Sequence, residues 1–286
     1  MPEVRLRGGE VDGLSLHYVV EGRGPAVILL HGLGGFAESW RHNIGGLAQR
    51  ATVYAIDLPG FGLSAKPRTR YRLPFFARAL HGFVETLGIP QVSLVGHSLG
   101  GAVAVTYALT HPVRVERLAL LGAPVPGFPY RESWILRLVA LYGLGEALAL
   151  LGRPGLLKAA LARCFVVPHA GEIDFLVEHE YAARTALPAR AAYLATLRHA
   201  RADFVEHGED YRRAIATLDL PVLLIHGRQD PVVDGTHCAA VAQGLRRAAV
   251  RWLDACGHFP QIERAETVNG WLAEFLVGRP APRGER

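Results

Sequence analysis

Short apolar runs alternate with helix-length amphipathic segments through the first half of the chain. The runs are β-branched or aliphatic on both faces, which is typical of parallel strands that helices cover on both sides. The predicted strands span residues 26–30, 52–56, 92–95 and 118–121, and the predicted helices span residues 38–49, 75–87 and 99–110. This alternation predicts a parallel sheet with crossover helices.

The pattern changes after Pro124. Residues 125–216 show helical periodicity but no convincing strand, and strands resume at 221–225 and 250–253 before a last helix at 263–276. The clearest helical stretches of the middle segment are 134–141, 173–183 and 189–205. We therefore expect an α/β core, residues 1–124 and 217–286, with a helical cap, residues 125–216, inserted over the sheet.

The longest apolar stretch, residues 133–151, lies inside the expected cap. Arg137 and Glu146 interrupt it, and two glycines break it further. It therefore predicts a pair of amphipathic helices beside a pocket, and we expect no membrane span.

Composition excludes several classes of protein. The chain has 286 residues, of which half are apolar, so it is long enough for one large folded core and is not disordered. Its net charge of +5 comes from scattered arginines, since Lys66 and Lys158 are the only lysines. Phosphate binding needs clustered cations, so we expect no nucleic-acid partner.

Cysteine usage and the N-terminal residues bear on the compartment. Cys164, Cys238 and Cys256 are odd in number and unrelated in spacing, which argues against a disulfide framework. Residues 1–13 are rich in charge and contain no apolar run of signal-peptide length. Both features favour a cytoplasmic protein.

The strand at 92–95 runs directly into Gly-His-Ser-Leu-Gly, residues 96–100, and a predicted helix follows at once. Gly-x-Ser-x-Gly at a strand-to-helix turn indicates a nucleophile elbow. A side chain at Gly96 or Gly100 would collide with neighbouring backbone, and the turn projects the hydroxyl of Ser98 above the sheet edge. Ser98 is the candidate nucleophile.

A serine hydroxyl needs a general base, and His258 is the best placed of the thirteen histidines. It follows the last predicted strand, at the carboxyl edge of the sheet where the serine also lies. His31 and His226 follow strands too, but each precedes a glycine and is expected to fix its loop. Cys256 and His258 have no matching second pair of ligands, so we expect no metal site.

Asp230 is the candidate carboxylate that orients the histidine, because it follows the strand at 221–225. The order Ser98, Asp230, His258 along the chain is the order typical of folds that carry a Gly-x-Ser-x-Gly nucleophile elbow. Asp234 and Asp57 are the rivals. We expect Asp234 to cap the next helix and Asp57 to hold its own loop.

An oxyanion hole requires two backbone N–H groups directed at one point. Leu99, which follows the nucleophile, is one candidate donor. The other is Leu33, in the glycine-rich loop 31–35 after the first predicted strand.

Taken together, these motifs resemble the α/β-hydrolase superfamily, in particular the branch with a helical cap inserted after the sixth strand. The resemblance covers nearly the whole chain and rests on five motifs in the right order: residues 31–35, 57–64, 96–101, 230–231, and 257–260 leading to Glu263. It implies an α/β-hydrolase fold with a mostly parallel eight-stranded sheet, no cofactor and an acyl-enzyme mechanism.

The resemblance also separates branches of the superfamily. Its haloalkane dehalogenases and epoxide hydrolases carry aspartate at the position of Ser98, so those activities are not expected. Many carbon–carbon bond hydrolases share the serine triad but have asparagine before the serine and tryptophan after the histidine. Here those positions hold His97 and Phe259, and Leu99 differs as well, which favours carboxylic esters.

The substrate is expected to be a small molecule with an apolar acyl or aromatic group. This follows if the apolar start of the cap faces the serine, although the same side chains could simply pack the cap onto the core: Phe128, Tyr130, Trp134, Ile135 and Leu138. Three hypotheses stand at this point: a carboxylesterase, a carbon–carbon bond hydrolase with the same triad, and a non-catalytic ligand receptor on this fold.

Overall fold

The computed structural model describes residues 2–131, 134–151 and 153–277, except for the side chains of 134–135, 149–151, 182–185 and 277. One eight-stranded sheet with the order β1-β2-β4-β3-β5-β6-β7-β8 forms the centre of the molecule. Its strands are β1 (Glu3–Arg5), β2 (Ser15–Glu21), β3 (Ala26–Leu30), β4 (Thr52–Ile56), β5 (Val92–His97), β6 (Val115–Leu121), β7 (Val222–Gly227) and β8 (Ala248–Leu253). Strand β2 runs antiparallel to both its neighbours and the other pairs are parallel, which confirms the expected mostly parallel eight-stranded sheet.

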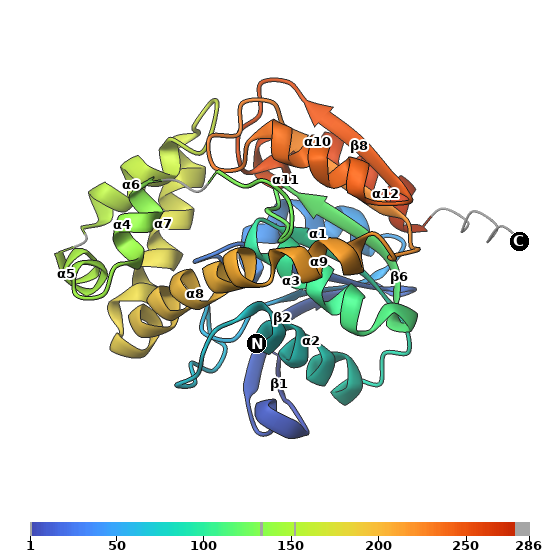
Figure 1. Ribbon diagram of the computed structural model, residues 1–286, viewed down its shortest axis with the longest axis horizontal. Helices are drawn as coiled ribbons and strands as arrows, with labels where there is room; N and C mark the ends of the chain where they lie inside the picture. Colours follow the sequence, from blue (N-terminus) through green and yellow to red (C-terminus); the bar gives the residue numbers. More distant parts are fainter. Residues whose placement is uncertain (1, 132–133, 152, 278–286) are drawn as a thin grey trace, which may run out of the picture.

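Helices cover both faces of this sheet (Figure 1). The core helices are α1 (Arg41–Ala48), α2 (Leu73–Thr86), α3 (Leu99–Thr110), α10 (Gly235–Gly244), α11 (Pro260–Glu263) and α12 (Ala265–Val277), with short 3-10 turns η1 (Gly9–Val11), η2 (Ala37–Trp40) and η3 (Pro112–Arg114). Helices α1 and α12 pack on one face, and α2, α3 and α10 pack on the other.

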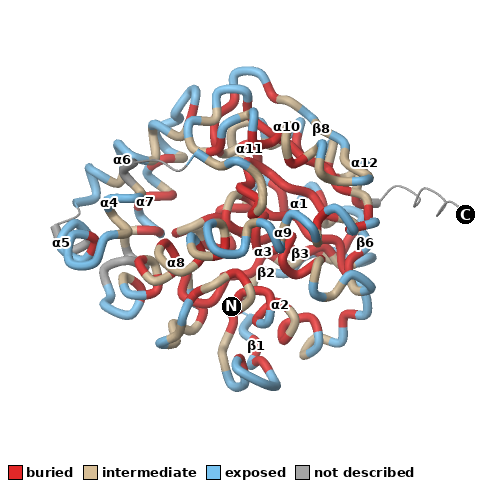
Figure 2. Tube along the Cα trace, viewed as in Figure 1, coloured by how far each residue is buried: buried red, intermediate tan, exposed pale blue. Residues whose placement is uncertain are grey.

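Alternation within each strand explains this three-layer packing. In β3, Val27 and Leu29 belong to the core under α1 and α12, whereas Ile28 and Leu30 belong to the core under α2 and α3. All four side chains are almost completely buried, and the central strands lie in the most buried region of the trace (Figure 2). A strand buried on both faces is mostly apolar, and this is why the central strands could be predicted from the sequence.

Strands β1 and β2 carry no such signal. Strand β1 alternates charged and apolar residues at the sheet edge, and β2 contains His17 and ends in Glu21. The N-terminal pair was therefore expected only through the family resemblance.

The segment between β6 and β7, which we call the cap, contains helices but no strand in its described residues. Its helices are α4 (Trp134–Ala140), α5 (Leu144–Leu151), α6 (Pro154–Ala162), α7 (Ala170–Thr185), α8 (Leu187–Glu206) and α9 (Gly208–Ile215). Helices α4 to α7 gather at one side of the molecule, and α8 runs from them back toward the core (Figure 1). Within the described part of the chain, no helix combines the length and apolarity that crossing a bilayer requires.

The close approach of α3 to β3 generates a stability prediction. A methyl group on Gly100 would collide with the backbone oxygens of Leu30 and His31, whereas Gly45 of α1 has open space around it. We expect Gly100→Ala to lower the free energy of unfolding by about 3 kcal/mol. The matched substitution Gly45→Ala should leave it unchanged or raise it by up to about 1 kcal/mol. Urea denaturation followed by circular dichroism measures both, and equal stability of the two variants would contradict this packing.

Candidate active site

Ser98 occupies the turn between β5 and α3. Its backbone has φ 50° and ψ −122°, a left-handed conformation that is unfavourable for any residue with a side chain. The N–H of Ser98 donates to the carbonyl of Leu121 in the neighbouring strand at 3.0 Å. A Cβ on Gly96 would collide with the backbone of Gly100, and a Cβ on Gly100 would collide with the backbone of Leu30. The sheet and the helix therefore hold the serine hydroxyl at the carboxyl edge of the strands, as the motif predicts.

His258 and Asp230 lie beside this hydroxyl. The Nε2 atom of His258 is 3.1 Å from Ser98 Oγ, and its Nδ1 atom is 2.9 Å from Asp230 Oδ2. A carboxylate only accepts hydrogen bonds, so Nδ1 carries the proton and Nε2 is left with the lone pair that faces the serine. The structure thus brings together three residues that lie far apart in the sequence.

Asp230 is held by its own loop. Its Oδ1 atom accepts N–H bonds from Val232 at 2.8 Å and from Val233 at 2.9 Å. Burial alone would raise the pKa of Asp230, but the adjacent His258 and the N–H of Val233 outweigh burial and bring the pKa below its usual value. His226 donates from Nε2 to the carbonyl of Val233 at 2.9 Å, which is the loop-fixing role expected for it.

The backbone of His258 is fixed on both sides. Its carbonyl accepts a hydrogen bond from Nε2 of His97 at 2.7 Å, and its N–H donates to the carbonyl of Cys164 in the cap at 2.7 Å. Burial lowers the pKa of His97 to about 3, so this ring is neutral and serves as a fixed donor. Neither hydrogen bond could be predicted from the sequence, because the partners are remote in the chain.

The glycine-rich loop lies directly against the serine. A Cβ on Gly32 would come 3.1 Å from Ser98 Cβ, and the N–H of Gly35 donates to the carbonyl of Gly32 at 3.0 Å, which closes a turn around Leu33. His31 fixes this loop through Nδ1 to the carbonyl of Gly32 at 2.7 Å, and its Nε2 accepts the N–H of Leu58. Leu33 is thus a central residue of a turn that touches the serine.

Leu99 is the first residue of α3, so its N–H has no partner within the helix. The positive end of the helix dipole points to the same place. Leu33 thus lies in a turn against Ser98, and Leu99 begins the helix that follows Ser98.

The rival carboxylates have other tasks. Asp234 caps α10 by accepting the N–H of Thr236 at 2.7 Å, which confirms the expectation for it. Asp57 accepts N–H bonds from Ala37 and Leu63, each at 2.7 Å, and lies 2.9 Å from Nδ1 of His17. Asp57 therefore organises its own loop, as expected, but its buried partner His17 was not anticipated.

An aromatic cluster joins the cap to the loops that flank Ser98. Phe259, next to His258, stacks on Phe165 of the cap with ring centroids 4.8 Å apart. Phe36, just after the glycine-rich loop, stacks on His179 of α7 at 5.0 Å. These contacts belong to a buried cluster between α6, α7 and the core. This cluster could not be predicted from the sequence, because its members come from four separate segments.

The apolar start of the cap is directed elsewhere. The ring of Phe128 packs over Gly244 of α10, and Tyr130 lies 5.8 Å from the rings of both Phe204 and His237. Leu138 is exposed. Packing of the cap onto the core thus accounts for Phe128 and Tyr130, and the side chains of Trp134 and Ile135 lie outside the described residues.

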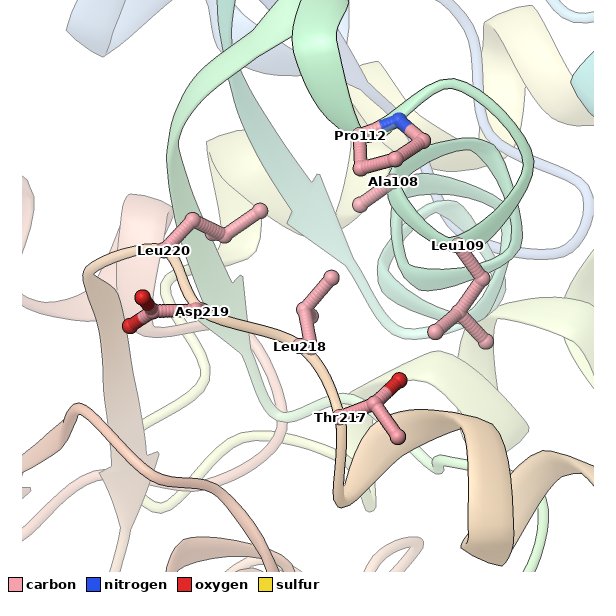
Figure 3. Close-up of a pocket in the computed structure, with 7 residues that line it drawn as sticks. All are labelled: Ala108, Leu109, Pro112, Thr217, Leu218, Asp219 and Leu220. Carbon is pink, nitrogen blue, oxygen red and sulfur yellow. The ribbon is translucent and has the colours of Figure 1, made fainter.

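A small pocket of about 150 Å³ lies away from these residues (Figure 3). It is formed by the end of α3, Pro112 and the segment 217–220 that leads into β7. The end of α3 is about 15 Å along the helix from Ser98. The pocket therefore belongs to the opposite edge of the sheet. Among the described residues, no group of three His, Cys, Asp or Glu side chains is arranged to hold a metal ion.

The comparisons with known proteins agree with this architecture. The family model for the alpha/beta hydrolase fold matches residues 25–265, and the chain belongs to this family. It is 30% identical over 269 residues to a 2-hydroxymuconate semialdehyde hydrolase of Pseudomonas sp. (strain CF600), covering 93% of this chain and 91% of that protein.

Solved structures are similar over most of the chain. The hydrolase of 2-hydroxy-6-oxo-6-phenylhexa-2,4-dienoate from Rhodococcus sp. strain RHA1 is 28% identical, with a TM-score of 0.80 over 92% of this chain and 95% of that one. Cfl2 from Burkholderia cenocepacia is 26% identical, with a TM-score of 0.81 and coverage of 93% of each chain.

The buried pair of Asp57 and His17 generates a pH-dependent prediction. The hydrogen bond to Asp57 raises the pKa of His17. Burial would raise the pKa of Asp57, but His17, His31 and two N–H groups together lower it. The carboxylate therefore stabilises the fold above its unfolded pKa of about 4, and the histidine does so fully below its unfolded pKa of about 6.5.

We expect Asp57→Asn to lower the free energy of unfolding by about 3 kcal/mol. The difference from the wild type should be largest between about pH 4 and pH 6.5, and should shrink as the pH falls through the folded pKa of Asp57 or rises through that of His17. Urea denaturation across this range measures it, with the exposed Asp254→Asn as control. A difference that does not change with pH would contradict the pairing.

Proposed function

We propose that this α/β-hydrolase is a serine hydrolase that cleaves carboxylic esters of small to medium apolar acyl groups. The observation that carries the proposal is the continuous chain of polar contacts from Asp230 through His258 to Ser98, at 2.9 and 3.1 Å. Nothing in this chain of contacts requires a partner beyond the substrate and water.

In the first half-reaction, Ser98 Oγ attacks the ester carbonyl carbon while His258 Nε2 takes the hydroxyl proton. The bond from the carbonyl carbon to the alcohol oxygen then breaks, and His258 returns the proton to the departing alcohol. Asp230 stabilises the imidazolium without taking its proton. The N–H groups of Leu33 and Leu99 donate to the oxyanion, and each is worth about 3 kcal/mol of barrier.

In the second half-reaction, His258 removes a proton from a water molecule that attacks the acyl-enzyme. The bond between Ser98 Oγ and the acyl carbon breaks, Oγ regains a proton from His258, and the acid leaves. The same three side chains thus serve both steps.

The aromatic cluster between the cap and the core favours a substrate with an apolar acyl group. Phe36 directly follows the glycine-rich loop, and Phe259 directly follows His258. Both pack in an apolar cluster with the cap. An acyl chain that enters between cap and core would meet this cluster.

A carbon–carbon bond hydrolase is the second candidate. It is favoured by relatives named as hydrolases of 2-hydroxymuconate semialdehyde and of a 2-hydroxy-6-oxo-dienoate, at 30% and 28% identity. The same nucleophile and base would act on a ketone carbonyl in that reaction. The residues around the triad favour esters, since His97 and Phe259 replace the asparagine and tryptophan of many such enzymes.

Hydrolysis of p-nitrophenyl esters of increasing acyl length tests the proposal. We expect kcat/KM to fall by about 10⁴-fold or more in Ser98→Ala, because no other group can form the acyl-enzyme. The matched control is Ser93→Ala in β5, the strand that leads to Ser98, and this variant should retain activity. The preferred acyl length then measures the size of the site.

The same preparations should be offered a vinylogous diketone of the ring-cleavage type. Fast cleavage of the diketone with slow ester turnover would reject the ester proposal in favour of the second candidate. Binding of either substrate class without turnover would reject both and indicate a ligand receptor.

A further inference from the structure

Two distant segments meet at the carboxylate of Glu263. One oxygen, Oε1, accepts the N–H of Gly257 at 2.8 Å and that of Phe259 at 3.4 Å, so it holds the residues on either side of His258. The other oxygen, Oε2, accepts the N–H of Val166 at 2.9 Å. Val166 belongs to residues 163–169, which we call the connector, between α6 and α7 of the cap.

The same connector also touches the general base directly. The carbonyl of Cys164 accepts the N–H of His258 at 2.7 Å, and a Cβ on Gly257 would collide with that carbonyl. Residues 164 and 166 therefore lie along the backbone of residues 257–259. Any displacement of the connector must break a hydrogen bond to His258 or to Glu263.

The turn before His258 depends on further support. Ala255 has φ 47°, an unfavourable value for a residue with a side chain. Its carbonyl accepts a bond from the guanidinium of Arg264 at 2.7 Å, and Gln229 exchanges hydrogen bonds with the backbone of Cys256. These bonds fix the start of the turn, and Glu263 fixes the part that carries the imidazole.

A carboxylate suits this position because both of its oxygens only accept hydrogen bonds. A glutamine of the same length has only one acceptor oxygen. Its NH₂ group would therefore face an N–H donor, either that of Val166 in the connector or those of residues 257 and 259, and could not accept a hydrogen bond from it. Burial raises the pKa of Glu263, while the three N–H groups lower it less. The position is thus costly to fill with a charge, and its hydrogen bonds offset only part of that cost.

We propose that Glu263 is a positioning residue that couples the cap to the general base, because one carboxylate ties Val166 of the cap connector to the backbone on both sides of His258. While the connector keeps its hydrogen bonds to His258 and Glu263, the imidazole stays within hydrogen-bond distance of Ser98. Displacement of the connector breaks these bonds and lets the imidazole move away from Ser98. The proposal rests on the proposed function for its catalytic consequence. The coupling itself is a property of the backbone and can be tested without turnover.

The test compares wild type, Glu263→Gln and the matched control Glu266→Gln, which removes an exposed charge from the following helix. For Glu263→Gln we expect kcat for the preferred p-nitrophenyl ester, and the rate at which a fluorophosphonate modifies Ser98, to fall about ten- to a hundredfold. KM should stay within about twofold of the wild-type value. Hydrogen exchange should accelerate together at residues 164–166 and 257–259. The control should match wild type in all four measurements.

Two outcomes would overturn the coupling. One is kcat and exchange in Glu263→Gln within about twofold of wild type, and the other is faster exchange in only one of the two segments. A wild-type protein that neither hydrolyses esters nor reacts with the fluorophosphonate would instead defeat the proposed function. Hydrogen exchange in the two segments would still decide the coupling in that case.

Discussion

The turn at Ser98 is the constraint on which the rest of the site depends. A residue with φ 50° costs about 1–3 kcal/mol, so its conformation persists only where the surroundings leave no alternative. Here β5 ends and α3 begins within one residue of the turn, and glycines at 96 and 100 allow β3, β5 and α3 to approach more closely than any side chain would permit. The hydroxyl is thereby fixed to the buried centre of the sheet. His258, Asp230 and the glycine-rich loop need only be brought to it.

The cap takes part in this arrangement. Its connector bonds to the backbone of His258 and to Glu263, and Arg41 and His42 of α1 pair with Glu172 of α7 near the glycine-rich loop. The cap thus contacts the loop of His258 and helix α1, which follows the glycine-rich loop in the chain.

The sequence predicts some of this structure well, for physical reasons. Central strands such as β3 are apolar on both faces, and α3 begins and ends where its pattern predicts because a strand–turn–helix motif and His111 bound it. The triad residues could be selected by their positions after strands. Edge strand β1, with three residues and two charges, has no such pattern. The pairing of His17 with Asp57 and the bond from Val166 to Glu263 join residues 40 and 97 positions apart, and no local pattern encodes them.

Identification of the residue that a fluorophosphonate modifies decides whether Ser98 is the nucleophile. The wild-type protein would be treated with the reagent, digested and sequenced by mass spectrometry. We expect one phosphonyl group per chain on Ser98, no modification in Ser98→Ala, and much slower modification in His258→Gln. Modification of another residue, or modification that persists unchanged in Ser98→Ala, would show that Ser98 is not the nucleophile.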